Sequence, residues 1–210
     1  MTQNSQPVLR PAKERASSGK RKGESRDRLL LAARRLFIER GYHATRPQDV
    51  ARAAGVGHGT FYLHFADKKA CFLAFVDEAR QELRDFVSQK TSSAKGLEGT
   101  IEAVLDAIYD YAESHPGVLA TAMTDETVIG RDGPEVAQTL LAQWGEEWAV
   151  TVRQLAQDHG GLPAAMDEAI VGQAIVGAIH QASAYSYWRK IPRHVLVKSL
   201  TKFIVRALHA

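Results

Sequence analysis

The feature that most constrains the fold is a series of apolar segments at helical spacing, separated by glycine and proline, between residues 25 and 90. The first segment follows Ser25, a residue suited to a helix N-cap, and stops at Gly41, which favours a helix end. Its apolar residues recur every three or four positions: Leu29, Ala32, Ala33, Leu36 and Phe37. This spacing predicts an amphipathic helix over about 25–40.

Two shorter helices are predicted next. Pro47 suits the first position of a helix that runs to about Ala54, and Gly55 can adopt the left-handed conformation that a tight turn needs. A further helix over about 58–65 pairs Phe61 with Phe65 on one face. Helices this short are not stable alone, so we expect the first helix and the start of a fourth to clamp them. The arrangement is typical of a helix-turn-helix.

The rest of the chain is also predicted to be helical. Asp67 is placed to cap a fourth helix that runs to about Lys90, and the stretch 91–99 indicates a break. Further helices are expected at about 98–114, 117–124, 134–158, 164–187 and 193–208. No stretch alternates as a strand would, so the fold class is all-α.

Charge is distributed unevenly along the chain. Residues 1–70 hold 15 Lys and Arg against 6 Asp and Glu, although the net charge of the whole chain is only +3. A basic N-terminal third suits a polyanion such as DNA, because neutralised phosphates release counterions. Residues 1–23 lack apolar periodicity and are predicted to form a disordered basic arm. This arm either enters a DNA minor groove or serves only as a solubilising tail.

Composition limits the remaining possibilities. The 210 residues, 45% of them hydrophobic, are enough to bury a core, and no run of about 18 apolar residues predicts a membrane span. The N-terminus lacks the apolar segment of a secretory signal, so we expect a cytoplasmic protein. The single Cys71 is interpreted as a buried hydrophobe, and no Cys/His cluster has zinc-site spacing. We therefore expect no metal and no cofactor.

Three stretches share a signature: Gly41-Tyr42-His43-Ala44-Thr45, then Asp49 to Val56, then Gly59-Thr60-Phe61-Tyr62-Leu63-His64-Phe65-Ala66-Asp67-Lys68. Together they resemble the DNA-binding signature of the tetracycline-repressor (TetR) family. The resemblance covers about residues 25–75 and agrees in register across three helices. It implies an all-α protein with an N-terminal three-helix helix-turn-helix DNA-binding domain over 24–70. A C-terminal helical ligand-binding and dimerisation domain would occupy 71–210.

The resemblance also implies roles for individual residues. Phosphate contacts would come from Thr45, Thr60, Tyr62, His64 and Lys68, which position the domain without reading sequence. By their chemistry, Gln48 suits adenine, His58 suits guanine, and Leu63 suits a thymine methyl group. Gly57 and Gly59 permit close approach to the groove. Tyr62 could instead cover the edge of the core, and His64 could be an ordinary surface histidine.

Two departures from the family pattern concern the DNA contacts. Arg46-Pro47 stands where the family usually has a small hydroxyl residue followed by an apolar one, and Gly57 replaces a usual Ser cap. Pro47 still begins a helix well, and either Thr45 or Arg46 could reach a phosphate. Gly57 caps more weakly, by a few tenths of a kcal/mol. These departures affect the exact DNA contacts rather than the fold.

The resemblance further implies a homodimer built from the last two long helices, with an unknown small-molecule effector bound among the preceding ones. Dimerisation would place two recognition helices about 34–36 Å apart on a palindromic operator. Candidate residues of the ligand pocket are mostly aromatic, and each could equally be core: Tyr109, Met123, Trp144, Trp148 and His180. The predicted function is a repressor that a small molecule releases from DNA.

Two other functions are alternatives to a ligand-controlled repressor. An enzyme would need a spaced nucleophile, base and orienting group, but His115 near Glu113, His159 beside Asp158 and an isolated Cys71 do not provide one. We therefore expect no enzymatic activity. A DNA-binding dimer without a ligand-sensing role is the other alternative, and it would need no pocket.

Overall fold

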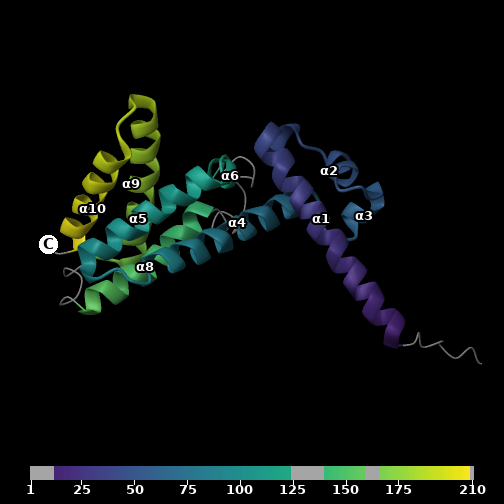
Figure 1. Cartoon of the computed structure of the whole chain (residues 1–210), viewed down its shortest axis with the longest axis horizontal. Coiled ribbons are helices and arrows are strands. Elements are labelled where there is room, and N and C mark those ends of the chain that lie inside the picture. Colours follow the sequence, from purple (N-terminus) through teal and green to yellow (C-terminus); the bar gives the residue numbers. More distant parts are fainter. Residues whose placement is uncertain (1–11, 124–139, 159–165, 209–210) are drawn as a thin grey trace, which may run out of the picture. The chain divides into compact units, whose positions relative to one another are not determined.

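The computed structural model describes residues 12–123, 140–158 and 166–208, and the regular structure in these ranges is helical (Figure 1). This agrees with the predicted all-α class. The chain divides into two compact units, Met1–Ala74 and Phe75–Ala210. Each unit has its own hydrophobic core, and the two are described in turn.

Helix α1 spans Ala12–Ala44, with a kink at Gly41, whose φ of 78° and ψ of 167° are non-helical. The interruption at Gly41 was predicted. The helix begins well before Ser25, so helix covers residues 12–23 of the segment 1–23 that was predicted as a disordered basic arm. Ala12, Lys13 and Glu14 are good helix formers that can extend an existing helix without apolar periodicity. Residues 1–11 lie outside the described part of the chain.

Helices α2 (Pro47–Ala53) and α3 (His58–Tyr62) follow, joined by a turn in which Gly55 has a φ of +66°. The left-handed turn at Gly55 is therefore confirmed. Helix α3 is shorter than the predicted 58–65, because Leu63 forms its C-cap. The Phe65 amide still donates to the Phe61 carbonyl at 2.9 Å, so the chain stays tightly turned beyond the cap.

Phenylalanines are the largest buried side chains in the core of this unit. Phe61 and Phe65 are buried as predicted, and their ring centroids lie 5.5 Å apart. Phe37 of α1 meets Phe72 edge to face at 5.1 Å, an arrangement that stabilises aromatic pairs beyond their buried area. These contacts tie α3 to the residues that follow it, and α1 to the start of α4.

Helix α4 (Lys68–Thr91) begins in the first unit and continues into the second. Its predicted cap is present, since Asp67 Oδ1 accepts a hydrogen bond from the Ala70 amide at 2.7 Å. The remaining described helices are α5 (Gly96–Ser114), α6 (Val118–Ala122), α8 (Leu140–Asp158), α9 (Glu168–Arg189) and α10 (Arg193–Leu208). Parts of the helices predicted over 117–124, 134–158 and 164–187 lie outside the described residues.

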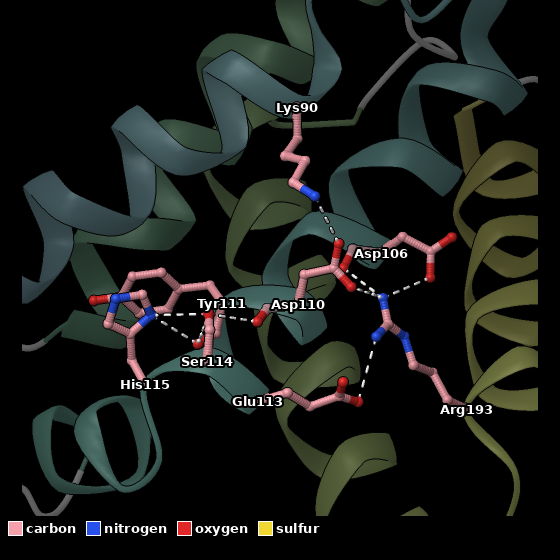
Figure 2. A network of polar contacts seen from close by, with 8 residues as sticks. All are labelled: Lys90, Asp106, Asp110, Tyr111, Glu113, Ser114, His115 and Arg193. Atoms are coloured by element: carbon pink, nitrogen blue, oxygen red, sulfur yellow. Dashed lines mark hydrogen bonds and ion pairs between the residues drawn. The ribbon is translucent and has the colours of Figure 1, made fainter.

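Two pairings hold the second unit together. Helices α8 and α9 pack tightly at Gly172, where an added Cβ would collide with the Gly145 carbonyl oxygen and lie 2.7 Å from the Ala149 amide nitrogen. Figure 2 shows the second pairing, in which Arg193 at the start of α10 binds carboxylates of α5. Its Nη2 lies 2.7 Å from Asp110 and 3.0 Å from Asp106, and its Nη1 lies 3.3 Å from Glu113. Hydrogen bonding from Arg193 lowers the pKa of Asp110.

Candidate functional site

Helix α3 buries one side and exposes the other. Phe61 is fully buried, whereas Tyr62 is 51% and Leu63 is 72% exposed. His58 and Gly59 are also exposed, and Thr60 is half-buried. An added Cβ at Gly59 would meet nothing within 4 Å, which leaves open space over this part of the helix. The unit therefore presents aromatic, imidazole, hydroxyl and apolar groups from a helix that is anchored in the core by Phe61.

The position of α3 is fixed by contacts around its ends. Arg28 of α1 donates hydrogen bonds to the carbonyl oxygens of Ala54 and, at 3.1 Å, Gly55, in the turn before α3. His58 and Tyr62 meet edge to face at 5.2 Å, one helical turn apart. These contacts orient the exposed side chains before any partner binds, which lowers the entropic cost of recognition.

The start of α2 contributes two more candidate residues. Arg46 is the N-cap of α2 and is exposed, and Gln48 in its first turn is exposed as well. Arg46 keeps its guanidinium available for a phosphate, and Gln48 keeps an amide that can make paired hydrogen bonds to a base edge. Both side chains are exposed, and their contacts with DNA stay a prediction.

Thr45 does not have the role that was predicted for it. Its side chain is fully buried, and its hydroxyl donates toward the carbonyl oxygens of Gly41 at 2.8 Å and Leu36 at 3.2 Å. A phosphate cannot reach a group in this position, so the assignment of the Thr45 side chain to phosphate binding is wrong. The hydroxyl instead satisfies carbonyls at the end of α1.

Lys68 and His64 also make internal contacts. Lys68 Nζ donates to the Tyr42 carbonyl at 2.9 Å and lies 4.1 Å from the centroid of the Tyr42 ring. Burial lowers the pKa of Lys68. His64 Nε2 lies 2.7 Å from the Ser25 hydroxyl oxygen. Lys68 thus holds the end of α1, and His64 holds Ser25. Sequence analysis missed these contacts, because the partners lie 26 and 39 positions away along the chain.

The second unit contains a half-open cavity of about 630 Å³ between α4, α5 and α8. Its volume falls in the range of sites for drug-sized ligands. Of the five predicted pocket residues, Trp144 and Trp148 line it. Tyr109 instead bonds to the Ser183 hydroxyl of α9 at 2.7 Å, and His180 is exposed on α9.

Met123, the C-cap of α6, is the fifth predicted pocket residue and is absent from the described lining. Tyr109, Met123 and His180 thus lie outside the described lining of this cavity, and their part in ligand binding stays a prediction. Apolar character alone does not distinguish core residues from lining residues. Sequence analysis also missed Arg84 and Glu147, which are charged and form an ion pair in the cavity wall. Their pairing joins residues 63 positions apart, so no local pattern indicated it.

Helices α9 and α10 expose large apolar side chains. Ile170 is 70% and Trp188 is 82% exposed on α9, and Phe203 is 58% exposed on α10. Tyr185 and Val195 add to this group. Exposed apolar patches of this kind often mark contacts between proteins.

Membrane-spanning helices and metal sites are two further features to consider in the described residues. None of the helices there is long and apolar enough to cross a membrane. Over the same ranges, no three His, Cys, Asp or Glu side chains gather in a way that would hold a metal ion. Cys71 is buried in the first unit, and its burial raises the thiol pKa to about 12.

Comparison with known proteins matches the first unit. Residues 29–75 fit the model of bacterial regulatory proteins of the tetR family. The chain is 31% identical over 110 residues to the HTH-type transcriptional activator FasR of Mycolicibacterium smegmatis, covering 50% of each chain. It is 40% identical over 57 residues to the HTH-type transcriptional repressor BepR of Brucella suis, covering 27% of each chain. The chain thus spans half or less of the length of these relatives.

The fold of the chain is also that of solved regulators. The transcriptional regulator FadR from Bacillus subtilis, solved in complex with stearoyl-CoA, superposes with a TM-score of 0.65 at 19% sequence identity. The likeness covers 87% of this chain and 98% of that chain, and at this identity it shows the fold alone. Together with the helix-turn-helix match, it confirms the resemblance found in the sequence. Residues 29–75 therefore match the tetR family of bacterial regulatory proteins, and the chain has the fold of a solved regulator.

Proposed function

We propose that this chain is a transcriptional regulator that binds DNA through α3 and the start of α2. The observation that carries the proposal is the division of α3 into a buried anchor, Phe61, and an exposed face that includes Tyr62 and Leu63. A helix held in this way fits the major groove, where side chains can reach base edges without rearrangement. The family match to residues 29–75 supports the same conclusion.

Within this interface the exposed residues divide by chemistry. Gln48, His58 and Leu63 read base edges, as adenine, guanine and thymine-methyl contacts respectively. Arg46, Thr60 and Tyr62 bind phosphates, whose contacts set the register of the domain on the duplex. Lys68 and His64 contribute mainly by positioning other residues. Lys68 holds the Tyr42 carbonyl at the end of α1, and His64 holds the Ser25 hydroxyl.

The regulator acts as a homodimer. The exposed apolar side chains of α9 and α10, including Ile170, Trp188 and Phe203, supply a surface that a second copy would cover. A two-fold axis places two α3 helices about one turn of DNA apart, so the operator is a palindrome with half-sites spaced accordingly.

A small molecule in the cavity of the second unit controls DNA binding. The volume of this half-open cavity and the indole rings of Trp144 and Trp148 support this role. The ligand favours a spacing of the two DNA-binding units that fits the operator poorly, so the protein acts as a repressor that the ligand releases. A DNA-binding dimer without ligand sensing would have no use for such a cavity.

Three measurements test the proposal. Selection of duplexes from random DNA identifies the operator, and light scattering gives the mass of the protein at micromolar concentration. A promoter reporter carrying the selected operator then shows the direction of regulation. Failure to enrich any duplex in dilute salt, or a monomer mass, contradicts the corresponding part of the proposal.

A further inference from the structure

The first turns of α1 are a part of the first unit that the proposed function does not use. Helix α1 begins at Ala12, whereas the described core residues of the unit begin at Leu29. At about 1.5 Å per residue, the helix from Ala12 to Ser25 is about 20 Å long. Figure 1 shows this first, purple part of α1 extending beyond α3. We call residues 12–23 the N-terminal extension.

The N-terminal extension is strongly basic. It consists of Ala, Ser, Gly, Lys and Arg with a single Glu, so it has no apolar side chain larger than that of alanine. Its five cationic residues against one acid give a net charge of +4: Lys13, Arg15, Lys20, Arg21 and Lys22. A helix that is polar on all sides cannot be stabilised by a hydrophobic core, so other interactions must support it.

The dipole of α1 favours an anionic partner for the extension. Lys13 and Arg15 lie in the first turn of the helix, where backbone amides without helical partners create a partial positive charge. Cations at this end are unfavourable, whereas an anion stabilises it. A polyanion would also reduce the repulsion among the five cations. Duplex DNA, with about one negative charge per 1.7 Å of its axis, is such a partner.

Contacts between α1 and the region of α3 place the start of the extension beside the proposed DNA-binding face. The Ser25 hydroxyl oxygen lies 2.7 Å from His64 Nε2, and His64 directly follows the exposed Leu63. About one helical turn later, Arg28 donates to the Gly55 carbonyl at 3.1 Å, in the turn before α3. The extension therefore leaves the unit next to α3, close to the DNA that α3 would bind.

The helical form of the extension limits how it can meet DNA. An α-helix with its side chains is about 10–12 Å across, whereas the minor groove is about 6 Å wide. Residues 12–23 as a helix do not fit the minor groove, which was one of the two alternatives for the basic arm. In the proposed complex α3 occupies the major groove of the half-site, which leaves the phosphate backbone for the extension.

We infer that the N-terminal extension binds the phosphate backbone of the operator next to α3, as a continuous helical arm of α1. Lysine and arginine contacts of this kind add affinity without reading bases, and they are strongest in dilute salt because they release counterions. This inference rests on the proposed function in taking duplex DNA as the partner of the first unit. A solubilising tail, the other alternative for the basic arm, would add no affinity for DNA.

A pair of charge variants of the full-length chain tests the contact. Lys20→Gln with Lys22→Gln removes two charges from the extension. Lys95→Gln with Lys190→Gln makes the same change at exposed lysines of the second unit and is the control. Fluorescence anisotropy on the selected duplex and on a shuffled duplex, over a range of salt concentrations, gives the affinity and its salt dependence.

The extension variant should bind both duplexes about tenfold more weakly than the natural protein in dilute salt. The slope of log K against log salt concentration should become shallower by about 0.9 for each phosphate contact that is lost. The control should bind like the natural protein.

A second pair of variants tests the helical form at constant charge. Gly23 joins the extension to the rest of α1, and a Cβ there would meet nothing within 4 Å. Gly23→Ala favours the helix, whereas Gly23→Pro interrupts it and keeps every charge. Gly23→Pro should lose helical circular dichroism relative to Gly23→Ala, and it should weaken DNA binding about as much as the charge variant does.

The outcomes separate this inference from the proposed function. If the extension variant and the control bind alike with the same salt dependence, the extension is a solubilising tail and the inference alone is wrong. If the charge variant weakens binding but the two Gly23 variants bind alike, an unstructured arm contacts DNA and helical docking is wrong. Binding that depends on Lys20 and Lys22 but prefers no selected sequence supports the inference and contradicts the proposed function. No binding to any duplex in dilute salt contradicts both.

Discussion

The Thr45 hydroxyl lies 2.8 Å from the carbonyl oxygen of Gly41, at the residue where α1 leaves helical geometry. This contact joins the end of α1 to the segment that leads into α2. Thr45 is fully buried, so leaving a polar group there without its partner would be costly.

Thr45→Val should therefore lower the free energy of unfolding by about 1–3 kcal/mol, because valine keeps the shape of the side chain but cannot donate. Thr45→Ser, which keeps the hydroxyl, should restore most of this loss. Urea unfolding of the three proteins measures both effects. Weaker DNA binding by Thr45→Val with unchanged stability would instead indicate that the hydroxyl contacts a phosphate.

The exposed residues of α2 and α3 should separate into two classes by mutation. Tyr62→Phe removes a phosphate donor and should weaken binding to specific and shuffled duplexes by a similar factor. Gln48→Ala should cost about 1–3 kcal/mol on the selected duplex and reduce the preference at one base pair. Electrophoretic shifts on both duplexes provide the measurement. A uniform loss for Gln48→Ala would refute its base-reading role.

Glycine at position 172 should be essential to the pairing of α8 with α9. A methyl group there would collide with the backbone of α8, including the amide nitrogen of Ala149. Gly172→Ala should thus destabilise the second unit by about 1–3 kcal/mol or more, as overpacking of a tight contact does. Gly99→Ala on α5 is the control, because a Cβ there meets nothing within 4 Å. Equal melting temperatures of the two variants would contradict the close contact.

The contact between Asp110 and Arg193 should stabilise the protein in a pH-dependent way. Since Arg193 lowers the folded-state pKa of Asp110, the stabilisation is fully present above the ordinary carboxyl pKa of about 4. It is lost as the pH falls through the lowered folded-state pKa, where the carboxylate becomes protonated. Asp110→Asn should therefore be less stable than the natural protein at neutral pH, by about 1 kcal/mol or less, since the pair is partly exposed.

Denaturant unfolding at neutral and acidic pH measures this dependence. The difference between the two proteins should shrink as the pH is lowered below about 4. If the difference in the free energy of unfolding between the two proteins stays constant over this pH range, the effect of Asp110→Asn does not come from the charge of Asp110.

Local patterns accounted for most of the helix-turn-helix. The spacing of Phe61 and Phe65 predicted the buried side of α3, Gly55 predicted the left-handed turn, and Asp67 predicted the cap of α4. Each of these features depends on residues within a few positions of one another. The predicted helix over 193–208 likewise matches α10, because Pro192 marks its start.

Features that depend on distant residues could not be predicted in this way. Thr45 was assigned to phosphate binding by the family resemblance, and only the packing of the folded unit reveals its burial. Two contacts between helices are examples: Arg84 pairs with Glu147, and Tyr109 pairs with Ser183. The order of the helices along the chain does not predict which side chains meet. The helix before Ser25 was missed because it has no apolar face to mark it.

The central claim is that α3 places its exposed face on duplex DNA. Selection of bound fragments from a random duplex library, followed by sequencing, tests it most directly. The account predicts an inverted repeat whose half-sites lie about one helical turn apart, and loss of that enrichment when Gln48 and Leu63 are both changed to alanine. A library that shows no enrichment in dilute salt, or an enrichment that the double variant retains, would contradict it.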